Sequence, residues 1–317
     1  MISLEQTAKS LLEHDNILLI AHVFPDGDTL GSCLGLCHAL QDLGKHARMT
    51  CFHTIPSTFD YLFEGLDQED FEEQYIVTVD VADLGLIGVG EEKYGHMIDL
   101  CIDHHATNRI AIENKYVRPS AAACAEIIFD LIGLLNTPIT PVIAACLYTG
   151  ISTDTGCFRF SNVTGYTHYV ASQLMKLDYD FETINRILFE ERSRARIELE
   201  AALFGSMRYY YQDRCAVAVI SQELLQKTGA TEADLDGITG LPRTIRGVLV
   251  GVTLRECEDG KYKVSVRTHE PYDAAAICAQ FGGGGHVRAA GCTVSGKTAQ
   301  ELEQEMLHVI KGVLGEI

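Results

Sequence analysis

Aspartate and histidine side chains gather in four short clusters within the first half of the chain. Carboxylates and imidazoles are the groups that bind divalent metal ions and transfer protons in enzyme sites. A single aspartate after a strand is more often a turn residue or a helix N-cap than a ligand. Four such clusters in one domain favour a metal site over four unrelated caps. The clusters are His22-Val-Phe-Pro-Asp26-Gly-Asp28, Asp80, Asp103-His104-His105 and Asp154.

Four of these carboxylates would place strong negative charge in a small volume if the clusters met: Asp26, Asp28, Asp80 and Asp154. Like charges this close cannot all stay ionised without compensation, which two divalent cations would supply. Oxygen ligands with a few imidazoles suit Mn²⁺, the favoured ion, or Mg²⁺ better than a structural zinc, which prefers thiolates. Two metal ions about 3.5–4 Å apart stabilise the attacking and leaving oxygens of a displacement at phosphorus. The chemistry predicted is hydrolysis of a phosphate ester, which is very slow without a catalyst.

A glycine-rich segment near the C-terminus, Phe281-Gly-Gly-Gly-Gly-His286, suits phosphate binding. Glycine backbone approaches a phosphate closely and offers its N–H groups. A flexible linker is the alternative, but the segment contains no serine and lies between a short predicted helix and an apolar stretch. Nearby arginines can pair with phosphate through two hydrogen bonds. They are Arg255, Arg267 and Arg288, with Arg243 and Arg246 as weaker candidates.

The elements that would position the four clusters alternate between short apolar strands and amphipathic or buried helices. This alternation predicts an α/β fold with a doubly wound, mainly parallel sheet, in which ligands bind at the carboxyl ends of the strands. The predicted strands are Asn16–Ala21, Ala47–Phe52, Tyr75–Val79 and Met97–Ile102. The predicted helices are Thr29–Leu43, Ser120–Leu135 and Pro141–Ile151.

The remaining chain predicts a helical connector and a smaller α+β domain. The connector is expected to be helical throughout Asp180–Tyr211. Strands are predicted at Cys215–Ile220, Gly247–Leu254 and Lys261–Arg267, and helices at Asp273–Phe281 and Thr298–Leu314. We therefore divide the chain into a catalytic domain (1–185), a helical linker (186–212) and a substrate-binding domain (213–317).

Charge and composition narrow the class of protein. The net charge of −19 argues against a protein that coats long nucleic acid, because such proteins need a broad basic surface. Residues 1–205 carry −17 of it and residues 206–317 only −2, so the second part is better suited to hold an anion. The eleven cysteines contain no C-x-x-C pair and are typical of buried thiols in a reducing compartment. Without a signal peptide or a membrane-length apolar run, the expected location is the cytoplasm.

In this order, the motifs resemble those of a known family. H-x-x-P-D-G-D, the strand-end Asp80, D-H-H and S-T-D-T-G resemble the four metal motifs of the DHH phosphoesterases. G-G-G-G-H with A-A-G resembles the DHHA1 substrate domain. The segment Pro119-Ser-Ala-Ala-Ala-Cys-Ala-Glu126 is similar to the nanoRNase branch, whose members degrade very short RNAs. Many of those members also remove a phosphate from 3′-phosphoadenosine 5′-phosphate (pAp).

The resemblance implies a role for each matching residue. One metal ion would be bound by His22, Asp26 and Asp80. The other would be bound by Asp28, Asp80, His104 and Asp154, with Asp80 bridging. His105 would donate to the substrate phosphate, and Asp103 would orient the two histidines after it. Arg267, Gly284, Gly285 and His286 would hold the substrate's end across an interdomain cleft, with weaker contributions from Arg288, Arg159 and Asn162.

Several alternatives remain open at this point. The substrate could instead be a cyclic or linear dinucleotide such as c-di-AMP or pApA. A nucleotide-sensing module without turnover belongs to another class, but it would be expected to lack a metal aspartate, and none is missing. A pyrophosphatase would not need the glycine-rich domain, and a processive RecJ-type exonuclease would need a basic channel. The sequence does not decide the preferred substrate, the direction of cleavage, the choice between Mn²⁺ and Mg²⁺, or whether the chain is a monomer or a homodimer.

Overall fold

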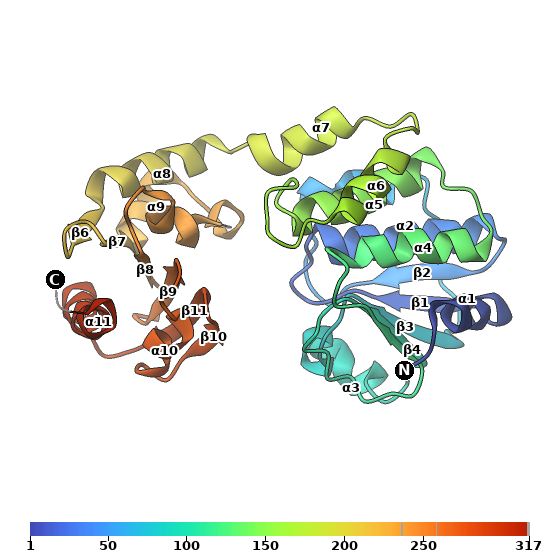
Figure 1. Cartoon of the computed structure of the whole chain (residues 1–317), viewed down its shortest axis with the longest axis horizontal. Coiled ribbons are helices and arrows are strands. Elements are labelled where there is room, and N and C mark those ends of the chain that lie inside the picture. The colour runs from blue at the N-terminus through green and yellow to red at the C-terminus, as the bar shows by residue number, and fades with distance from the viewer. Residues whose placement is uncertain (236, 258, 316–317) are drawn as a thin grey trace. The chain divides into compact units, whose positions relative to one another are not determined.

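The computed structural model describes residues 1–235, 237–257 and 259–315 of the chain. The chain divides into two compact units, Met1–Glu191 and Arg192–Ile317. Figure 1 shows a separate sheet in each of them. Each unit has a hydrophobic interior of its own. Among the described residues, no helix is both long and apolar enough to cross a membrane.

The first unit is built on a five-stranded sheet in the order β2-β1-β3-β4-β5, with every neighbouring pair parallel. Strands β1 and β3 are buried along their whole length, as expected for a parallel sheet covered on both faces. Ile17 and Leu19 face one hydrophobic cluster, and Leu18 and Ile20 face another. The strands are β1 Ile17–Ile20, β2 Ala47–Thr50, β3 Tyr75–Val79, β4 Leu100–Asp103 and β5 Lys115–Val117.

Helices cover this sheet, and two of them bring distant residues together. α2 packs against α5 along a seam of small residues, where a Cβ on Gly31 would overlap the carbonyl oxygen of Cys146. Because α2 begins at the first aspartate cluster and α5 ends at Asp154, this contact joins two of the predicted clusters. The helices are α1 Leu4–Glu13, α2 Gly27–Asp42, α3 Glu91–Tyr94, α4 Cys124–Leu135, α5 Pro141–Asp154, α6 Gly165–Leu174 and α7 Phe181–Asn185. Two 3₁₀ segments, Ser57–Phe63 and Leu84–Gly90, and a π-helical turn, Arg186–Glu190, complete the unit.

The second unit contains a six-stranded sheet in the order β10-β11-β9-β8-β7-β6, in which only β7 and β8 are parallel. One face packs on α10 and α11 through residues such as Ile277 and Met306, and the other packs on α8 through Leu199 and Leu203. The strands are β6 Arg208–Tyr210, β7 Cys215–Ile220, β8 Val250–Glu256, β9 Tyr262–Thr268, β10 Gly284–His286 and β11 Ala289–Val294. The helices are α8 Arg194–Ser206, α9 Gln222–Thr228, α10 Ala274–Ala279 and α11 Ala299–Leu314, with 3₁₀ segments at Glu232–Leu235 and Ile238–Thr244.

The fold confirms the predicted α/β class, but several boundaries differ, including the start of the strand predicted at Gly247, which begins at Val250. A continuous helix over Asp180–Tyr211 is wrong, because Glu191 is extended and the Ser193 hydroxyl, accepting from the Arg196 N–H, caps a new helix. The residues at its predicted end form β6 instead. The strand predicted to begin at Met97 begins at Leu100, since the Asp99 carboxylate accepts a hydrogen bond from the Ile76 N–H just before it. The helix predicted from Ser120 begins at Cys124.

Candidate active site

The first aspartate of the His22–Asp28 loop has two separate functions. Asp26 is the N-cap of α2, where its Oδ1 accepts hydrogen bonds from the N–H groups of Asp28 (3.0 Å) and Thr29 (3.1 Å). Its Oδ2 lies 3.7 Å from the Nε2 of His22. The interpretation of this motif as a turn with a helix cap is therefore correct for one oxygen. The other oxygen remains available to a ligand.

Asp28 is fully buried and caps a helix far away in the sequence. Its Oδ2 accepts from the Cys124 N–H at 2.6 Å, and its Oδ1 accepts from the Ala125 N–H at 3.0 Å. Helix α4 starts at these residues, and its own N-cap residue, Ala123, provides no side-chain hydrogen bond. The first N–H groups of a helix carry partial positive charge, which stabilises a carboxylate. The start of α4 thus fixes the position of Asp28.

Asp80 lies at the centre of the site, directly after β3. Its φ of +60° is in the left-handed region, which is uncommon for a residue other than glycine and concentrates at functional sites. Its side chain is 3% exposed. Its Oδ2 lies 3.6 Å from the Nε2 of His22, and its Oδ1 lies 3.5 Å from the Nε2 of His104. Oδ1 is buried without a hydrogen-bond partner among the described residues, which is costly unless another group binds it.

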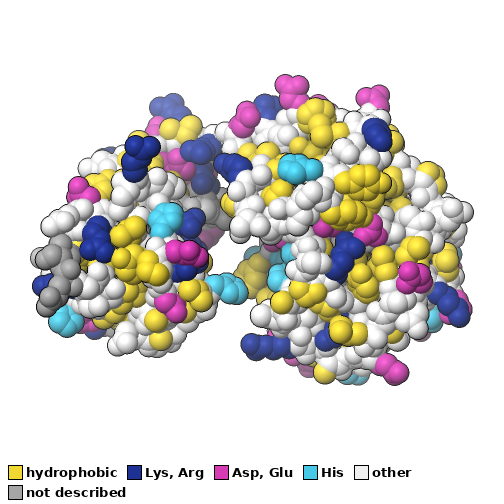
Figure 2. All heavy atoms as spheres, in the orientation of Figure 1, with side chains coloured by type: hydrophobic (Ala, Val, Ile, Leu, Met, Phe, Trp, Pro, Cys, Tyr) yellow, Lys and Arg dark blue, Asp and Glu magenta, His cyan; other side chains and the backbone are white. Residues whose placement is uncertain are grey.

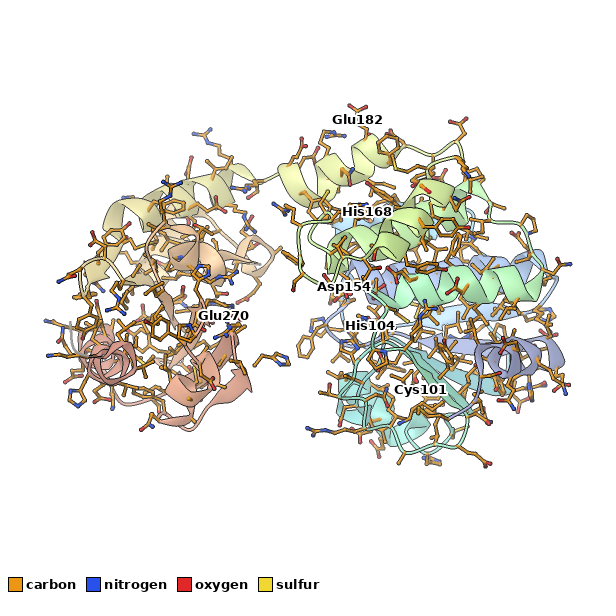
Figure 3. All side chains as sticks on the ribbon, in the orientation of Figure 1. Cys101, His104, Asp154, His168, Glu182 and Glu270 are labelled. Atoms are coloured by element: carbon orange, nitrogen blue, oxygen red, sulfur yellow. The ribbon has the colours of Figure 1, made fainter. Side chains whose placement is uncertain are left out.

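His104 presents one defined nitrogen to the cluster. Its Nδ1 lies 3.1 Å from the carbonyl oxygen of Ala121. A carbonyl oxygen only accepts, so Nδ1 carries the hydrogen and Nε2 keeps its lone pair. That Nε2 lies 3.4 Å from the Oδ2 of Asp154 and 3.8 Å from the Oδ2 of Asp28. Figure 3 labels His104 and Asp154, which come together from a loop after β4 and from the end of α5.

Asp103 lies behind the two histidines and fixes their backbone. Its Oδ1 accepts from the N–H groups of His104 and His105 and from the Nδ1 of His105, the last at 2.8 Å. Its Oδ2 accepts from the amide of Asn108 at 2.6 Å. Burial would raise the pKa of Asp103, but hydrogen bonds from His105 and Asn108 hold it below its usual value. The hydrogen bond to Asp103 in turn raises the pKa of His105, which is 44% exposed.

Three carboxylates of the cluster, Asp28, Asp80 and Asp154, have raised pKa values and resist ionisation in the protein alone. Burial, followed by the charges of Asp28 and Asp26, raises the pKa of Asp80 well above its ordinary value. The same causes raise the pKa of Asp154 to about 8. Burial also raises the pKa of Asp28, although His104 and the α4 N–H groups oppose this. His22 shows the complementary effect, since burial lowers its pKa and favours the neutral, ligating imidazole. A cluster of this kind needs external positive charge.

These donors fit divalent metal ions. The closest ligand atoms are 3.4–3.8 Å apart, which is long for a hydrogen bond. Atoms that share one cation at about 2.0–2.2 Å lie roughly 3–3.6 Å from each other. Three groups of donor atoms each lie within 4.8 Å: His22, Asp26 and Asp80; Asp28, His104 and Asp154; and Asp80, His104 and His105. The unpartnered Oδ1 of Asp80 belongs to this set.

The segment after Asp154 is held by its own polar groups. Asn162 donates to the carbonyl oxygens of Ala122 (2.9 Å) and Asp154 (3.1 Å). The Nε of Arg159 donates to the carbonyl oxygen of Gly156 at 2.5 Å. Both residues were predicted to contact substrate, and both have structural hydrogen bonds here. The exposed guanidinium of Arg159 keeps further donors for a ligand.

The glycine-rich segment of the second unit is an edge strand and not a linker. Gly284, Gly285 and His286 form β10, which pairs with Ala289–Gly291 and is exposed along its length. A Cβ on Gly285, whose φ is +141°, would lie 2.7 Å from the Ala289 carbonyl oxygen. A Cβ on Gly284 would meet nothing within 4 Å. The backbone of Gly284 is therefore open to a ligand.

The arginines of this unit divide into two groups. Arg267, on β9, has no carboxylate partner within the described ranges; it donates to the Val266 carbonyl oxygen at 3.1 Å. Burial and the nearby Arg243 lower the pKa of Arg267, and two such cations together favour an anion. Arg288 pairs with Glu270 and donates to the Tyr272 carbonyl oxygen, while Arg255 pairs with Glu232. Of the three favoured arginines, Arg255, Arg267 and Arg288, it is thus Arg267 that has no carboxylate partner among the described residues.

Several contributors to the site were not predicted from the sequence. Asn108 was missed, although an amide in the polar turn after D-H-H could have suggested a partner for Asp103. The carbonyl oxygen of Ala121 and the N–H groups of Cys124 and Ala125 were also missed. Backbone groups have no residue-type signal, so only the folded chain reveals them.

Two family models match the chain. One is described as "DHH family, N-terminal domain" and matches residues 16–151. The other is described as "DHHA1 domain" and matches residues 212–316. Together they cover both units and contain all predicted metal ligands except Asp154, which lies three residues beyond the first match.

Individual proteins that are similar to this chain over most of its length support these family matches. A Thermus thermophilus protein named "Bifunctional oligoribonuclease and PAP phosphatase NrnA" is 35% identical over 301 residues, which are 93% of this chain and 89% of that protein. An exopolyphosphatase-related protein from Bacteroides fragilis has a similar structure (TM-score 0.86, 24% identity, 98% of this chain and 95% of that chain). RecJ from Thermus thermophilus, solved in complex with Mn²⁺, shares the fold at a TM-score of 0.54 and 16% identity, with 97% of this chain and 54% of that chain covered.

Proposed function

Because the chain belongs to the DHH family, with its N-terminal DHH domain followed by a DHHA1 domain, we propose that it hydrolyses short oligoribonucleotides and the 3′-phosphate of pAp. The observation that carries this proposal is the grouping of acidic and imidazole donors around Asp80, whose buried Oδ1 has no hydrogen-bond partner among the described residues. The relative named as an oligoribonuclease and PAP phosphatase, aligned over 93% of the chain, supports the choice of substrates.

The donor set is assigned to two divalent ions, with Mn²⁺ preferred over Mg²⁺. His22, Asp26 and Asp80 would hold one ion, and Asp28, Asp80, His104 and Asp154 the other. When bound, the ions neutralise the carboxylates and stabilise negative charge that develops on the phosphoryl oxygens. Asp28 cannot swing away, because the start of α4 binds both of its oxygens. Asp80 faces His22 with one oxygen and His104 with the other, so it is the residue that joins the two groups.

His105 is assigned to the substrate phosphate. Its Nδ1 hydrogen bonds to Asp103, which leaves Nε2 as the atom that can donate to a phosphoryl or leaving oxygen. The raised pKa keeps the imidazolium populated closer to neutral pH. Asp103 touches no substrate in this assignment. It acts by orienting His105 and by fixing the backbone of His104.

The second unit is assigned to recognition of the substrate's end by Arg267, Gly284, Gly285 and His286. These groups offer a guanidinium that has no carboxylate partner among the described residues, the exposed glycines of β10 and an imidazole. Such a set can hold one phosphate or one nucleotide but not a long backbone. Figure 2 agrees on the face that it shows, where basic and acidic side chains are interspersed and form no continuous basic band. The domain limits of 1–185, 186–212 and 213–317 remain predictions.

The test compares three substrates in parallel with Mn²⁺, Mg²⁺ and EDTA: a 5′-phosphorylated RNA dinucleotide, pAp and a cyclic dinucleotide. We expect metal-dependent release of mononucleotide from the first and of phosphate from the second. Preference for the cyclic substrate would move the function to dinucleotide second messengers. Failure to hydrolyse any of the three, with the metal-binding site intact, would contradict the proposal.

A further inference from the structure

A sharp turn follows Asp154 and carries an aromatic ring that the fold does not use. Gly156, Cys157 and Phe158 have φ values of +55°, +57° and +60°, a run of three residues in the left-handed region. Left-handed residues normally occur singly, so this run reverses the chain at a cost in backbone strain. The reversal brings Phe160 back over the residue that began the turn.

The ring of Phe160 rests on Gly156. A Cβ at Gly156 would lie 2.5 Å from Cε1 and 2.7 Å from Cε2 of the ring, so only glycine leaves room for it there. The residue is nevertheless 57% exposed. One part of the ring is thus supported by backbone while the rest faces solvent. This arrangement differs from that of a side chain extended into solvent without support.

Hydrogen bonds hold the turn in place. The N–H of Phe158 donates to the Thr155 hydroxyl at 3.0 Å, and the N–H of Phe160 donates to the Thr155 carbonyl oxygen at 3.0 Å. Phe158 itself points into the unit, where its ring stacks on His168 at 5.4 Å between centroids and touches the ring of Tyr148. The two phenylalanines of this turn therefore lie in different surroundings. Phe158 anchors the turn, and Phe160 has no aromatic partner within the residues that the structure describes.

The position of this ring relates it to the proposed reaction. Gly156 is two residues beyond Asp154, and two peptide units span at most about 7–8 Å. Asn162 ties the end of the same turn to the Asp154 carbonyl oxygen. A nucleotide whose phosphate meets the Asp80 cluster carries its base at a comparable distance. Aromatic faces bind bases of any identity by stacking, which suits an enzyme that degrades short RNA without reading its sequence.

We propose that Phe160 is a base-stacking residue, on which the nucleobase next to the reacting phosphate lies. The inference rests on the proposed function and deepens it, because it assigns part of the substrate's affinity to the base. Phe24 is the competing ring. It is 71% exposed and stands between the predicted ligands His22 and Asp26, but no glycine among the described residues lies against its ring as Gly156 lies against that of Phe160.

The test compares pAp with ribose 3,5-bisphosphate, which has the same phosphates and no base. In the full-length enzyme with Mn²⁺, Phe160→Leu should raise the KM for pAp about 5-fold or more and leave the KM for the base-free compound unchanged. Phe160→Tyr keeps an aromatic face and should have the same KM for pAp as the parent enzyme. Phe204→Leu, at a 44% exposed ring on α8, is the matched control and should change neither KM.

The outcomes separate the two proposals. If the parent enzyme hydrolyses neither pAp nor short RNA, the proposed function fails. If the parent is active and Phe160→Leu shifts both KM values equally, the ring is structural and the inference fails. A shift confined to Phe24→Leu would assign stacking to the other loop. A changed elution volume for Phe160→Leu with an unchanged KM ratio would show that the ring contacts a second copy of the chain.

Discussion

Asp80 and His286 are both assigned to the substrate phosphate, directly or through metal, but the chain places them in opposite surroundings. The Asp80 side chain is 3% exposed at the end of a central parallel strand, and its neighbours Asp28 and Asp103 are fully buried. His286 is exposed on β10, the edge strand of the second sheet. Ligands that must hold divalent ions need fixed positions and low solvent access. Groups that capture a substrate need exposure first.

The largest effect is expected from Asp80→Asn, which removes one charge and almost no volume. We expect kcat/KM for pAp to fall by about 10³-fold or more, because the residue joins both groups of donors. Circular dichroism should show an intact fold. Thermal melts with EDTA should show a variant at least as stable as the parent, since a buried carboxylate among like charges opposes folding.

Metal addition completes this first prediction. At about 100 times its Kd, Mn²⁺ should stabilise the parent by about 2.7 kcal/mol, and this gain should largely disappear in Asp80→Asn. Equal stabilisation of both proteins would show that the metal does not bind at Asp80.

A smaller effect is expected at Asn108, which contacts Asp103 behind the proposed metal ligands. Asn108→Ala removes the 2.6 Å hydrogen bond to the Oδ2 of Asp103 and leaves a buried oxygen unpaired. Loss of such a supporting contact should lower metal affinity or kcat by about 10–100-fold. Because Asn108 also helps to hold the pKa of Asp103 low, the acid limb of the pH–rate profile should move to higher pH. A uniform loss of activity with no shift in that limb would indicate a purely structural effect.

In the exposed region, we expect changes in binding without changes in chemistry. His286→Ala should raise the KM for pAp about 5–10-fold, the loss of roughly one charge-assisted hydrogen bond, and leave kcat within about twofold. Initial rates over a range of substrate concentrations separate the two constants. An unchanged KM for every substrate would remove His286 from the recognition site.

The smallest effects are expected at the two glycines of β10, where one substitution tests the backbone conformation and the other tests the access of a ligand to the backbone. Gly285→Ala should cost about 1 kcal/mol or more of unfolding free energy, because its φ is +141° and Ala289 blocks the new methyl group. Gly284→Ala has free space and should change stability by less than about 0.5 kcal/mol, but it should raise KM if a phosphate approaches that backbone. Chemical denaturation and KM measurements on this pair decide whether the glycines serve the hairpin or the ligand.

The difference between the buried site around Asp80 and the exposed strand that carries His286 also explains which features could be predicted from the sequence. Alternating apolar strands and helices predicted the parallel sheet, and the carboxyl-end rule predicted that the four clusters would converge. Side-chain identity alone could not show that Asp28 caps α4, or that Ala121 selects the tautomer of His104. The break at Glu191–Ser193 was missed because charged residues of high helix propensity surround it. Strand β10 was not predicted, since a run of glycines has no strand pattern.

The seam between α2 and α5 has a consequence for interpreting variants of this chain. Gly31 has no chemical group to contribute, yet it touches the backbone of α5 so closely that any side chain would push the two helices apart. Those helices carry Asp28 and Asp154, which together with Asp80 lie around the Nε2 of His104. A screen for inactive mutants would therefore recover Gly31 alongside the aspartates, and its loss-of-function score would report helix spacing and not catalysis.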